Sequence, residues 1–134
     1  DVGRVAFLLA DETAAEVIES LAADGDGTKS FLEREWYGFD HAEAGAILAE
    51  DWGLALELCD AIRWHHEPSE AGAARDLATI LNAADAVAYR LGAGATLEPP
   101  TGVTTAPLDL SPEDEAALLE RVQTAWDAQR DLLG

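Results

Sequence analysis

Apolar side chains recur every three or four residues along most of the chain, which is the spacing typical of amphipathic helices. In residues 2–21 this pattern is made by Val5, Leu8, Leu9, Val17, Ile18 and Leu21. We expect a break in that helix near residues 11–13, where Asp11 or Thr13 is suited to cap a second helix. No segment alternates apolar and polar residues for long enough to predict a strand, so the pattern predicts an all-α fold.

Glycine and proline delimit the predicted helices in the middle of the chain. A helix capped by Ser30 ends at Gly38, because glycine readily adopts the left-handed conformation that closes helices. Asp40 is suited to cap the next helix, which is thin because it is rich in alanine and glycine and which ends at Gly53. A further helix is predicted over 54–66, since Pro68 disfavours helix in the residue before it.

The last third of the chain predicts two more helices and a loop. Residues 70–91 form the longest central helix predicted, with an inward stripe at Leu77, Leu81, Ala84, Ala88 and Leu91. Asp85 lies beside this stripe, so we expect it to be drawn towards the core. Residues 94–110 predict a surface loop, and residues 111–133 a C-terminal helix that begins at Ser111. Its predicted inward positions are Leu119, Val122, Trp126 and Leu133.

Length and charge restrict the function. With 134 residues, the chain is expected to form one domain, residues 1–134. The net charge is −19, from 27 acidic against 8 basic residues, which excludes nucleic acid and anionic membranes as direct partners. A single cysteine, Cys59, fits a reducing cytoplasm. Because the chain contains no methionine, we expect it to be a piece of a longer protein or a processed chain.

All three histidines of the chain lie between residues 41 and 66. Together with Asp85 they are ligands suited to Mn, Fe, Ni, Zn or Mg. Consecutive helical residues diverge by about 100°, so His65 and His66 reach one ion only if the helix frays near Pro68. Otherwise the second histidine faces another metal or a substrate phosphate. The alternative is that the histidines pack or lie at solvated helix ends without metal.

Several segments of the sequence resemble the HDOD domain, a divergent branch of the HD superfamily that is related to the HD-GYP phosphodiesterases. The resemblance runs from Asp1 to about Gly92. The segments that carry it are Asp1–Arg4, Asp40–Leu48, Trp52–Leu54, Ala61–Pro68 and Ala83–Asp85. It implies an HD-like multi-helix bundle that lacks its N-terminal helices, so that the chain is the C-terminal part of the domain. By the same resemblance, the metal ligands fall on Asp1, His41, His65, His66 and Asp85.

The resemblance also implies a function. The residues after His66 lack the Asp-Gly-x-Gly-Tyr-Pro signature of the HD-GYP enzymes. We therefore expect a non-catalytic or degenerate HD module of bacterial-type signal transduction, which is cytoplasmic and contacts other signalling proteins. The alternative is a metal-dependent phosphohydrolase that acts on a nucleotide or cyclic dinucleotide, for which Arg63 and Arg90 are the nearest basic residues.

Three further expectations concern metal, burial and assembly. We expect no bound cofactor and weak binding of any divalent metal, because Asp1 is a chain end and the HD histidine is absent from the chain. Asp85 is expected to be largely buried and to contact one of the three histidines. An uncovered apolar face is expected to cause self-association.

Overall fold

The structure, a computed structural model, describes residues 2–25, 28–91 and 106–133, and this part of the chain contains helices and no strand. The helices are α1 (Val2–Ala10), α2 (Glu12–Ala23), α3 (Lys29–Tyr37), α4 (His41–Asp51), α5 (Leu56–Arg63), α6 (Arg75–Arg90) and α7 (Pro112–Leu133). Short 3-10 turns cover Pro68–Glu70, Gly72–Ala74 and Ala106–Leu108. The prediction of an all-α helical bundle is confirmed.

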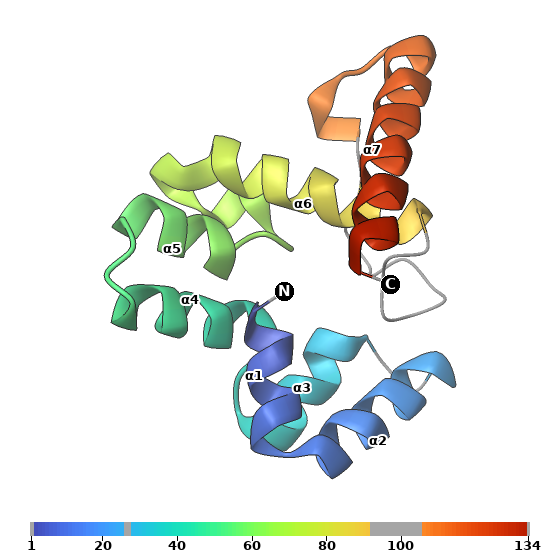
Figure 1. The fold of residues 1–134 in the computed structure, drawn as a ribbon. Helices are drawn as coiled ribbons and strands as arrows, with labels where there is room; N and C mark the ends of the chain where they lie inside the picture. The colour runs from blue at the N-terminus through green and yellow to red at the C-terminus, as the bar shows by residue number, and fades with distance from the viewer. Residues whose placement is uncertain (1, 26–27, 92–105, 134) are drawn as a thin grey trace.

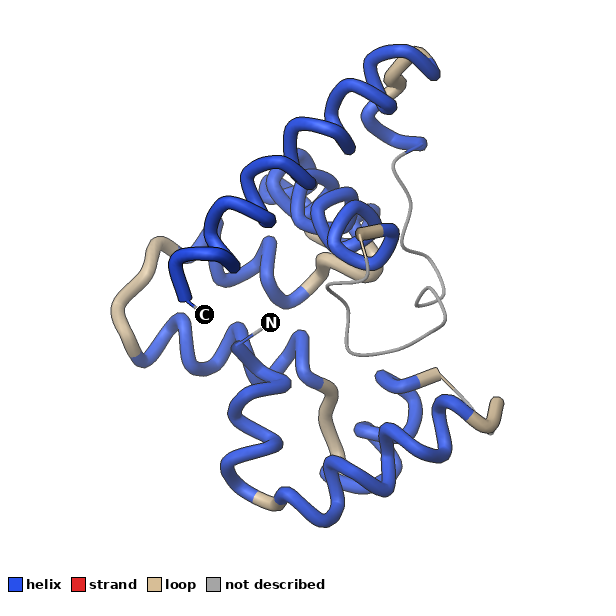
Figure 2. Tube along the Cα trace, turned by 45° about the vertical axis from the view of Figure 1, so that its right-hand side comes forward, coloured by secondary structure: helices blue, strands red, loops and turns tan. Residues whose placement is uncertain are grey.

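The helices form a layered bundle with α4 near its middle (Figure 1). α1 packs on α4, α4 packs against α5, and α5 packs against α6. α2 and α3 complete a group with α1 on one side of α4, and α7 stands across the C-terminal half of α6 (Figures 1 and 2). None of the described helices is both long enough and apolar enough to cross a bilayer.

Side chains at the helix starts satisfy backbone N–H groups that have no partner within the helix. Asp11 caps α2, as one of the two predicted alternatives, and Asp40 caps α4 by accepting from the Glu43 N–H at 3.0 Å. The predicted cap of α3 at Ser30 is wrong. Thr28 caps that helix instead, accepting from the Phe31 N–H at 3.2 Å, because the helix already begins at Lys29.

The backbones of α1 and α4 meet at two glycines. A Cβ atom on Gly3 would lie 1.9 Å from the carbonyl oxygen of His41 and 2.9 Å from the backbone nitrogen of Gly45. The buried positions of α4 are small apart from His41: Ala42, Ala44, Gly45, Ala46 and Ala49. The prediction of a thin α4 is therefore confirmed, and the close packing holds the first turn of α4 in place.

Two predicted helix boundaries and one predicted stripe are wrong. α5 ends at Arg63 rather than residue 66, and α6 begins at Arg75 after two 3-10 turns. The buried face of α6 consists of Ala78, Asn82, Ala83, Ala86 and Val87, about one position away from the predicted stripe. Small side chains allow α6 to approach its neighbours closely, so its leucines lie at the edge of the interface, with Leu77 38% exposed.

α7 packs less completely than the other helices. Leu119 and Val122 are half-buried as expected, but Trp126 is 45% exposed, so its predicted inward position is only partly correct. A nearly apolar cavity of about 340 Å³ separates α6 from α7. Of the predicted 94–110 loop, residues 94–105 lie outside the described residues, as does the side chain of Leu133. α7 is the longest described helix.

Candidate metal centre

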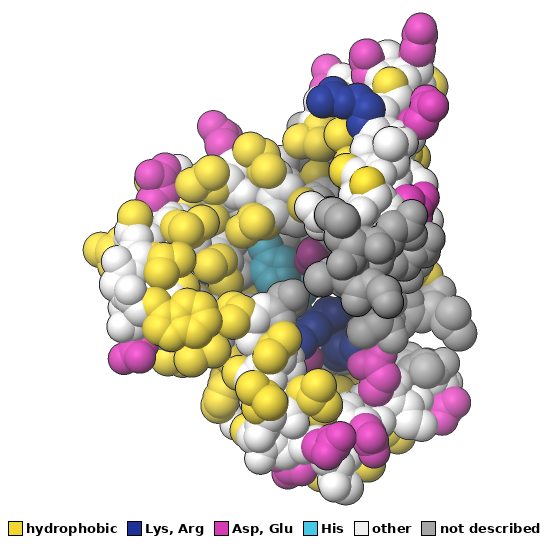
Figure 3. Space-filling view, in the orientation of Figure 1, with side chains coloured by type: hydrophobic (Ala, Val, Ile, Leu, Met, Phe, Trp, Pro, Cys, Tyr) yellow, Lys and Arg dark blue, Asp and Glu magenta, His cyan; other side chains and the backbone are white. Residues whose placement is uncertain are grey.

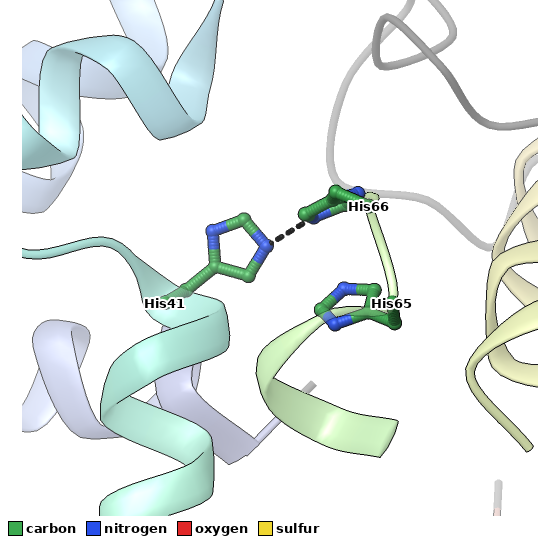
Figure 4. Close-up of side chains that lie close together, drawn as sticks. All are labelled: His41, His65 and His66. Atoms are coloured by element: carbon green, nitrogen blue, oxygen red, sulfur yellow. Dashed lines mark hydrogen bonds between the residues drawn. The ribbon is translucent and has the colours of Figure 1, made fainter. Parts of the chain in front are cut away.

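The three histidines come together where the start of α4 lies beside the end of α5 (Figure 4). One ligand nitrogen from each of His41, His65 and His66 lies within 4.8 Å of the other two. His41 is the first residue of α4, and the other two histidines follow the end of α5. His41 is 0% and His65 5% exposed, so this is a buried cluster rather than a set of solvated helix ends.

His65 and His66 both face the cluster because α5 ends before them. Trp64 closes α5 in a non-helical conformation, and the Glu67 N–H donates back to the Trp64 carbonyl at 2.9 Å. The side-chain amide of Asn82 on α6 donates to the His65 carbonyl at 2.7 Å, which fixes the turn. Of the two alternatives predicted for these histidines, the structure has the one in which the helix ends, and it ends earlier than expected.

His41 is held by a buried carboxylate. Glu33 Oε2 lies 2.5 Å from His41 Nδ1 and accepts from the His41 backbone N–H at 2.9 Å. With its Nδ1–H donated to the carboxylate, the imidazole presents the lone pair of Nε2 to the cluster. Sequence reasoning missed Glu33, because it reaches the site from α3 across the turn at residues 38–40 and no local spacing links it to the histidine.

Two groups lie beside the ring nitrogens of His65. Its Nδ1 donates to the Ile62 carbonyl at 2.6 Å, and its Nε2 lies 3.4 Å from Asp85 Oδ2. Burial lowers the pKa of His65, an effect partly opposed by the Ile62 carbonyl and by the Asp85 carboxylate. The predicted contact of Asp85 with a histidine is confirmed. The prediction that Asp85 is largely buried is wrong, since its side chain is 41% exposed. The buried face of α6 lies about one position away from the predicted stripe, which leaves Asp85 at the edge of the interface.

His66 completes the cluster in its neutral form. Its Nε2 lies 2.7 Å from His41 Nε2, and its buried Nδ1 has no hydrogen-bond partner among the described residues. Burial, and then the neighbouring imidazoles of His65 and His41, lower the pKa of His66 to about 2. Neutral imidazole is the form that ligates metals. The donor set, its protonation and the unpartnered nitrogen therefore fit a divalent cation.

A polar cavity of about 240 Å³ adjoins the cluster at His66. Its walls include half of the chain's eight basic residues: Arg4, Lys29, Arg34 and Arg63. Figure 3 shows basic side chains gathered beside the histidines in a hollow of this face. The sequence did not reveal this group, because its members come from α1, α3 and α5. Arg90, expected to be near the site, instead pairs with Glu115 on α7 at 2.6 Å.

Most of these basic side chains already have acidic partners. Lys29 pairs with Glu19, and Arg34 pairs with Asp40 at 2.7 Å. Arg63 pairs with Glu50 at 2.9 Å. Arg4 differs, because its Nε is buried without a hydrogen-bond partner among the described residues. The cavity can thus accept an anion, but one that competes with protein carboxylates for three of the four cations.

Comparison with known proteins gives one match. The family model for the HDOD domain matches residues 1–68, half of the chain. The match includes His41, His65 and His66 and ends before Asp85, so it is shorter than the resemblance expected to reach Gly92. It lies in the N-terminal half of the chain, and Asp1, at its start, lies outside the described residues. No curated protein and no solved structure matches the chain.

Proposed function

Because the chain belongs to the HDOD domain family, we propose that it is a signalling module of the HD type that binds one divalent cation and acts through protein contacts. The observation that carries this proposal is the convergence of His41, His65 and His66. Three imidazoles held by the fold offer three ligands and leave a fourth position open, a donor set that suits zinc and other borderline cations.

The cation site is supported by the groups behind the ligands. Glu33 fixes the ring of His41 and the Ile62 carbonyl fixes the ring of His65, so each ring presents its Nε2 to the cluster. Such partners typically change metal affinity by 10–100-fold. The weak binding expected from the sequence assumed that both Asp1 and the HD histidine, which is absent from the chain, were needed. Three preassembled nitrogens favour a tighter site.

A role in binding rather than hydrolysis is supported by the position of Asp85. Hydrolysis by two metals needs ligands that hold a pair of ions about 3.5–4 Å apart. Among the described residues, the ligand cluster consists of the three histidines, and Asp85 contacts His65 from the side with 41% of its side chain exposed. With its Nδ1–H donated to the Ile62 carbonyl, the neutral ring of His65 has no proton on Nε2 for Asp85 to accept, so the carboxylate lies beside the ligand nitrogen and the three imidazoles hold one ion.

Action through protein contacts, including self-association, is supported by the apolar side chains near the α4–α5 connection. Ile47, Trp52 and Leu56 are 50%, 60% and 75% exposed. Apolar side chains gather over α4 and α5 in the space-filling view (Figure 3). A concentration of exposed apolar side chains is typical of a protein–protein contact surface.

Thermal unfolding of the EDTA-treated protein tests the cation site. Manganese, nickel or zinc at about 100 times its dissociation constant stabilises by about 2.7 kcal/mol, which we expect to raise Tm by about 5–10 °C. The rise should disappear in His41→Ala and His66→Gln. It should persist in Asp76→Asn, which neutralises an exposed acid on the same helix as Asp85. No rise, or an equal rise in the histidine variants, refutes the cation site.

A phosphohydrolase is the second candidate, and the group of basic residues beside His66 favours it. Its test is hydrolysis of bis(p-nitrophenyl) phosphate with manganese present. For the proposed module we expect no turnover above buffer. Turnover that is lost in both His66→Gln and Arg63→Gln, and kept in Arg90→Gln on α6, would establish the enzyme and overturn the non-catalytic proposal.

A further inference from the structure

A separate cavity of about 330 Å³ lies among α1, α2 and α3, and no histidine lines it. Its walls are mainly apolar, formed by Phe7, Leu8, Ala15, Ile18 and the ring of Tyr37. Phe7 and Tyr37 stack with ring centroids 4.5 Å apart, so one wall is a rigid aromatic pair. The volume corresponds to about eleven water-sized groups, which is the size of a substituted benzene ring.

Polar atoms without partners belong to residues of the same walls. Arg4 Nε, Glu19 Oε1 and the Tyr37 hydroxyl are buried, and none has a hydrogen-bond partner within the described residues. Buried polar atoms without partners are rare in native proteins. An apolar cavity with a few polar groups is the usual form of a small-molecule site. These atoms therefore indicate the chemistry of an occupant.

The ligand chemistry follows from the donors and acceptors. Arg4 Nε donates, Glu19 Oε1 accepts, and burial raises the pKa of the Tyr37 phenol, which keeps its proton available for donation. The lining contains two basic and three acidic side chains, which are Arg4 and Lys29 against Glu16, Glu19 and Glu33. In a chain of net charge −19, this balance disfavours an anion.

We propose that this cavity binds a small uncharged amide with an apolar body. The body lies against the Phe7–Tyr37 pair, the amide carbonyl accepts from Arg4 or Tyr37, and the amide N–H donates to Glu19. An amide combines a hydrogen-bond donor and an acceptor in one neutral group. The three unpartnered atoms need both, because Arg4 Nε and the Tyr37 hydroxyl donate and Glu19 Oε1 accepts. The site is distinct from the histidine cluster, and its existence does not depend on the bound cation.

The cavity shares Arg4 and Lys29 with the polar cavity beside His66, and Glu33 links it to the histidine cluster itself. Glu33 lines the cavity, and its Oε2 is the atom that holds His41 Nδ1 and the His41 backbone N–H. An occupant that contacts Glu33 or displaces α3 therefore alters the surroundings of His41. The amide site is an input site whose occupancy the histidine cluster reports.

Benzamide is the probe, titrated into the full chain and followed by NMR. We expect saturable shifts at Ile18 and at the His41 Cε1–H. Ala15→Leu fills the cavity and should weaken binding at least tenfold, whereas Ala117→Leu, the same change on an exposed face of α7, should leave it unchanged. Tyr37→Phe keeps the stacked ring and loses one hydrogen bond, which should weaken binding about three- to tenfold.

Two related probes test the chemistry. Toluene lacks the polar group and benzoate lacks the donor, so both should bind more weakly than benzamide, with benzoate the weakest. Tighter binding of benzoate, or benzamide binding that Ala15→Leu does not change, overturns the proposed site. Saturation with benzamide without a shift of the His41 Cε1–H overturns the link to the histidine cluster and leaves the amide site standing.

Discussion

Two regions of the bundle are packed differently, one with small side chains and the other with large ones. Where α1, α4 and α5 meet, the packed side chains are mostly alanine and glycine, and backbones touch at Gly3 and Gly45. Between α6 and α7 the contacts come from Val87, Leu118, Val122 and Trp126, yet these surround a cavity of about 340 Å³. The region with the smaller side chains is the more tightly packed.

This difference shows that the histidine cluster depends more on how closely the helices approach than on how much apolar area they bury. Small residues bring helix axes close, and the ligand atoms of the three histidines at the helix ends are then held within 4.8 Å of one another. Larger residues on α6 and α7 contribute apolar area, but half-buried side chains leave the helix free to adjust. We therefore expect changes in the first region to affect both stability and the histidines, and changes in the second to affect stability weakly.

The largest expected effect is that of Gly3→Ala. The new Cβ would lie 1.9 Å from the His41 carbonyl oxygen, which belongs to the backbone and cannot rotate away. Overpacking costs about 1–3 kcal/mol and occasionally more, and we expect a loss of about 3 kcal/mol or more in the free energy of unfolding, measured by urea denaturation.

Gly45→Ala is the matched control for that substitution. Its Cβ would first meet Ile62 Cγ2 at 3.2 Å, a side-chain atom that can move. We expect a loss of about 1 kcal/mol or less. Equal losses in the two variants would show that the α1–α4 backbone contact has no special weight and would remove the basis of the comparison.

The two regions also differ in how well the sequence predicts them. Gly38, Gly53 and Asp40 are local signals, and the helix ends and the cap that they predict are present. The face of α6 was predicted from its leucines and is wrong by about one position, because close packing against α5 selects Ala78, Asn82 and Ala83 instead. Periodicity locates a helix, but its orientation is decided by tertiary contacts.

In the candidate site, too, the sequence predicts only what local signals carry. His41, His65, His66 and Asp85 could be singled out because they are chemically unusual for their positions, and the family resemblance grouped them. Their ligand roles stay predictions. Glu33 and the basic residues of the neighbouring cavity could not be found in this way. They are common surface residue types whose roles depend on segments that meet only in the folded chain.

Removing a helix cap should have an intermediate effect on stability, and a cap can be removed in each of the two regions. Asp40 is 3% exposed, caps α4 and pairs with Arg34, whereas Ser111 caps α7 from an exposed position. Loss of a cap costs about 0.5–2 kcal/mol. We expect Asp40→Ala to cost about 2 kcal/mol and Ser111→Ala about 0.5 kcal/mol in urea denaturation. The reverse order would show that α7 contributes more to the fold than its exposure indicates.

The last comparison is the pH dependence of stability, and it belongs to the tightly packed region because all three histidines lie there. In the unfolded chain His66 binds a proton below its ordinary pKa of 6.5. In the folded chain the pKa of His66 is about 2, so the ring stays neutral until the pH approaches that value. This contribution to stability is complete above pH 6.5 and decreases as the pH falls towards 2. His65, whose pKa is also lowered, acts in the same direction.

Between pH 7 and pH 5 in EDTA, we expect His66 to account for a loss of about 1–2 kcal/mol in the free energy of unfolding, a range that allows for its partial exposure. Partial protonation of carboxylates opposes this loss by reducing the repulsion within a chain of net charge −19. The difference between the wild type and His66→Gln removes that common effect, since both carry the same acids. If the two proteins lose the same stability between these pH values, the histidine does not carry the acid sensitivity, and the cluster is not the neutral, buried centre that metal binding requires.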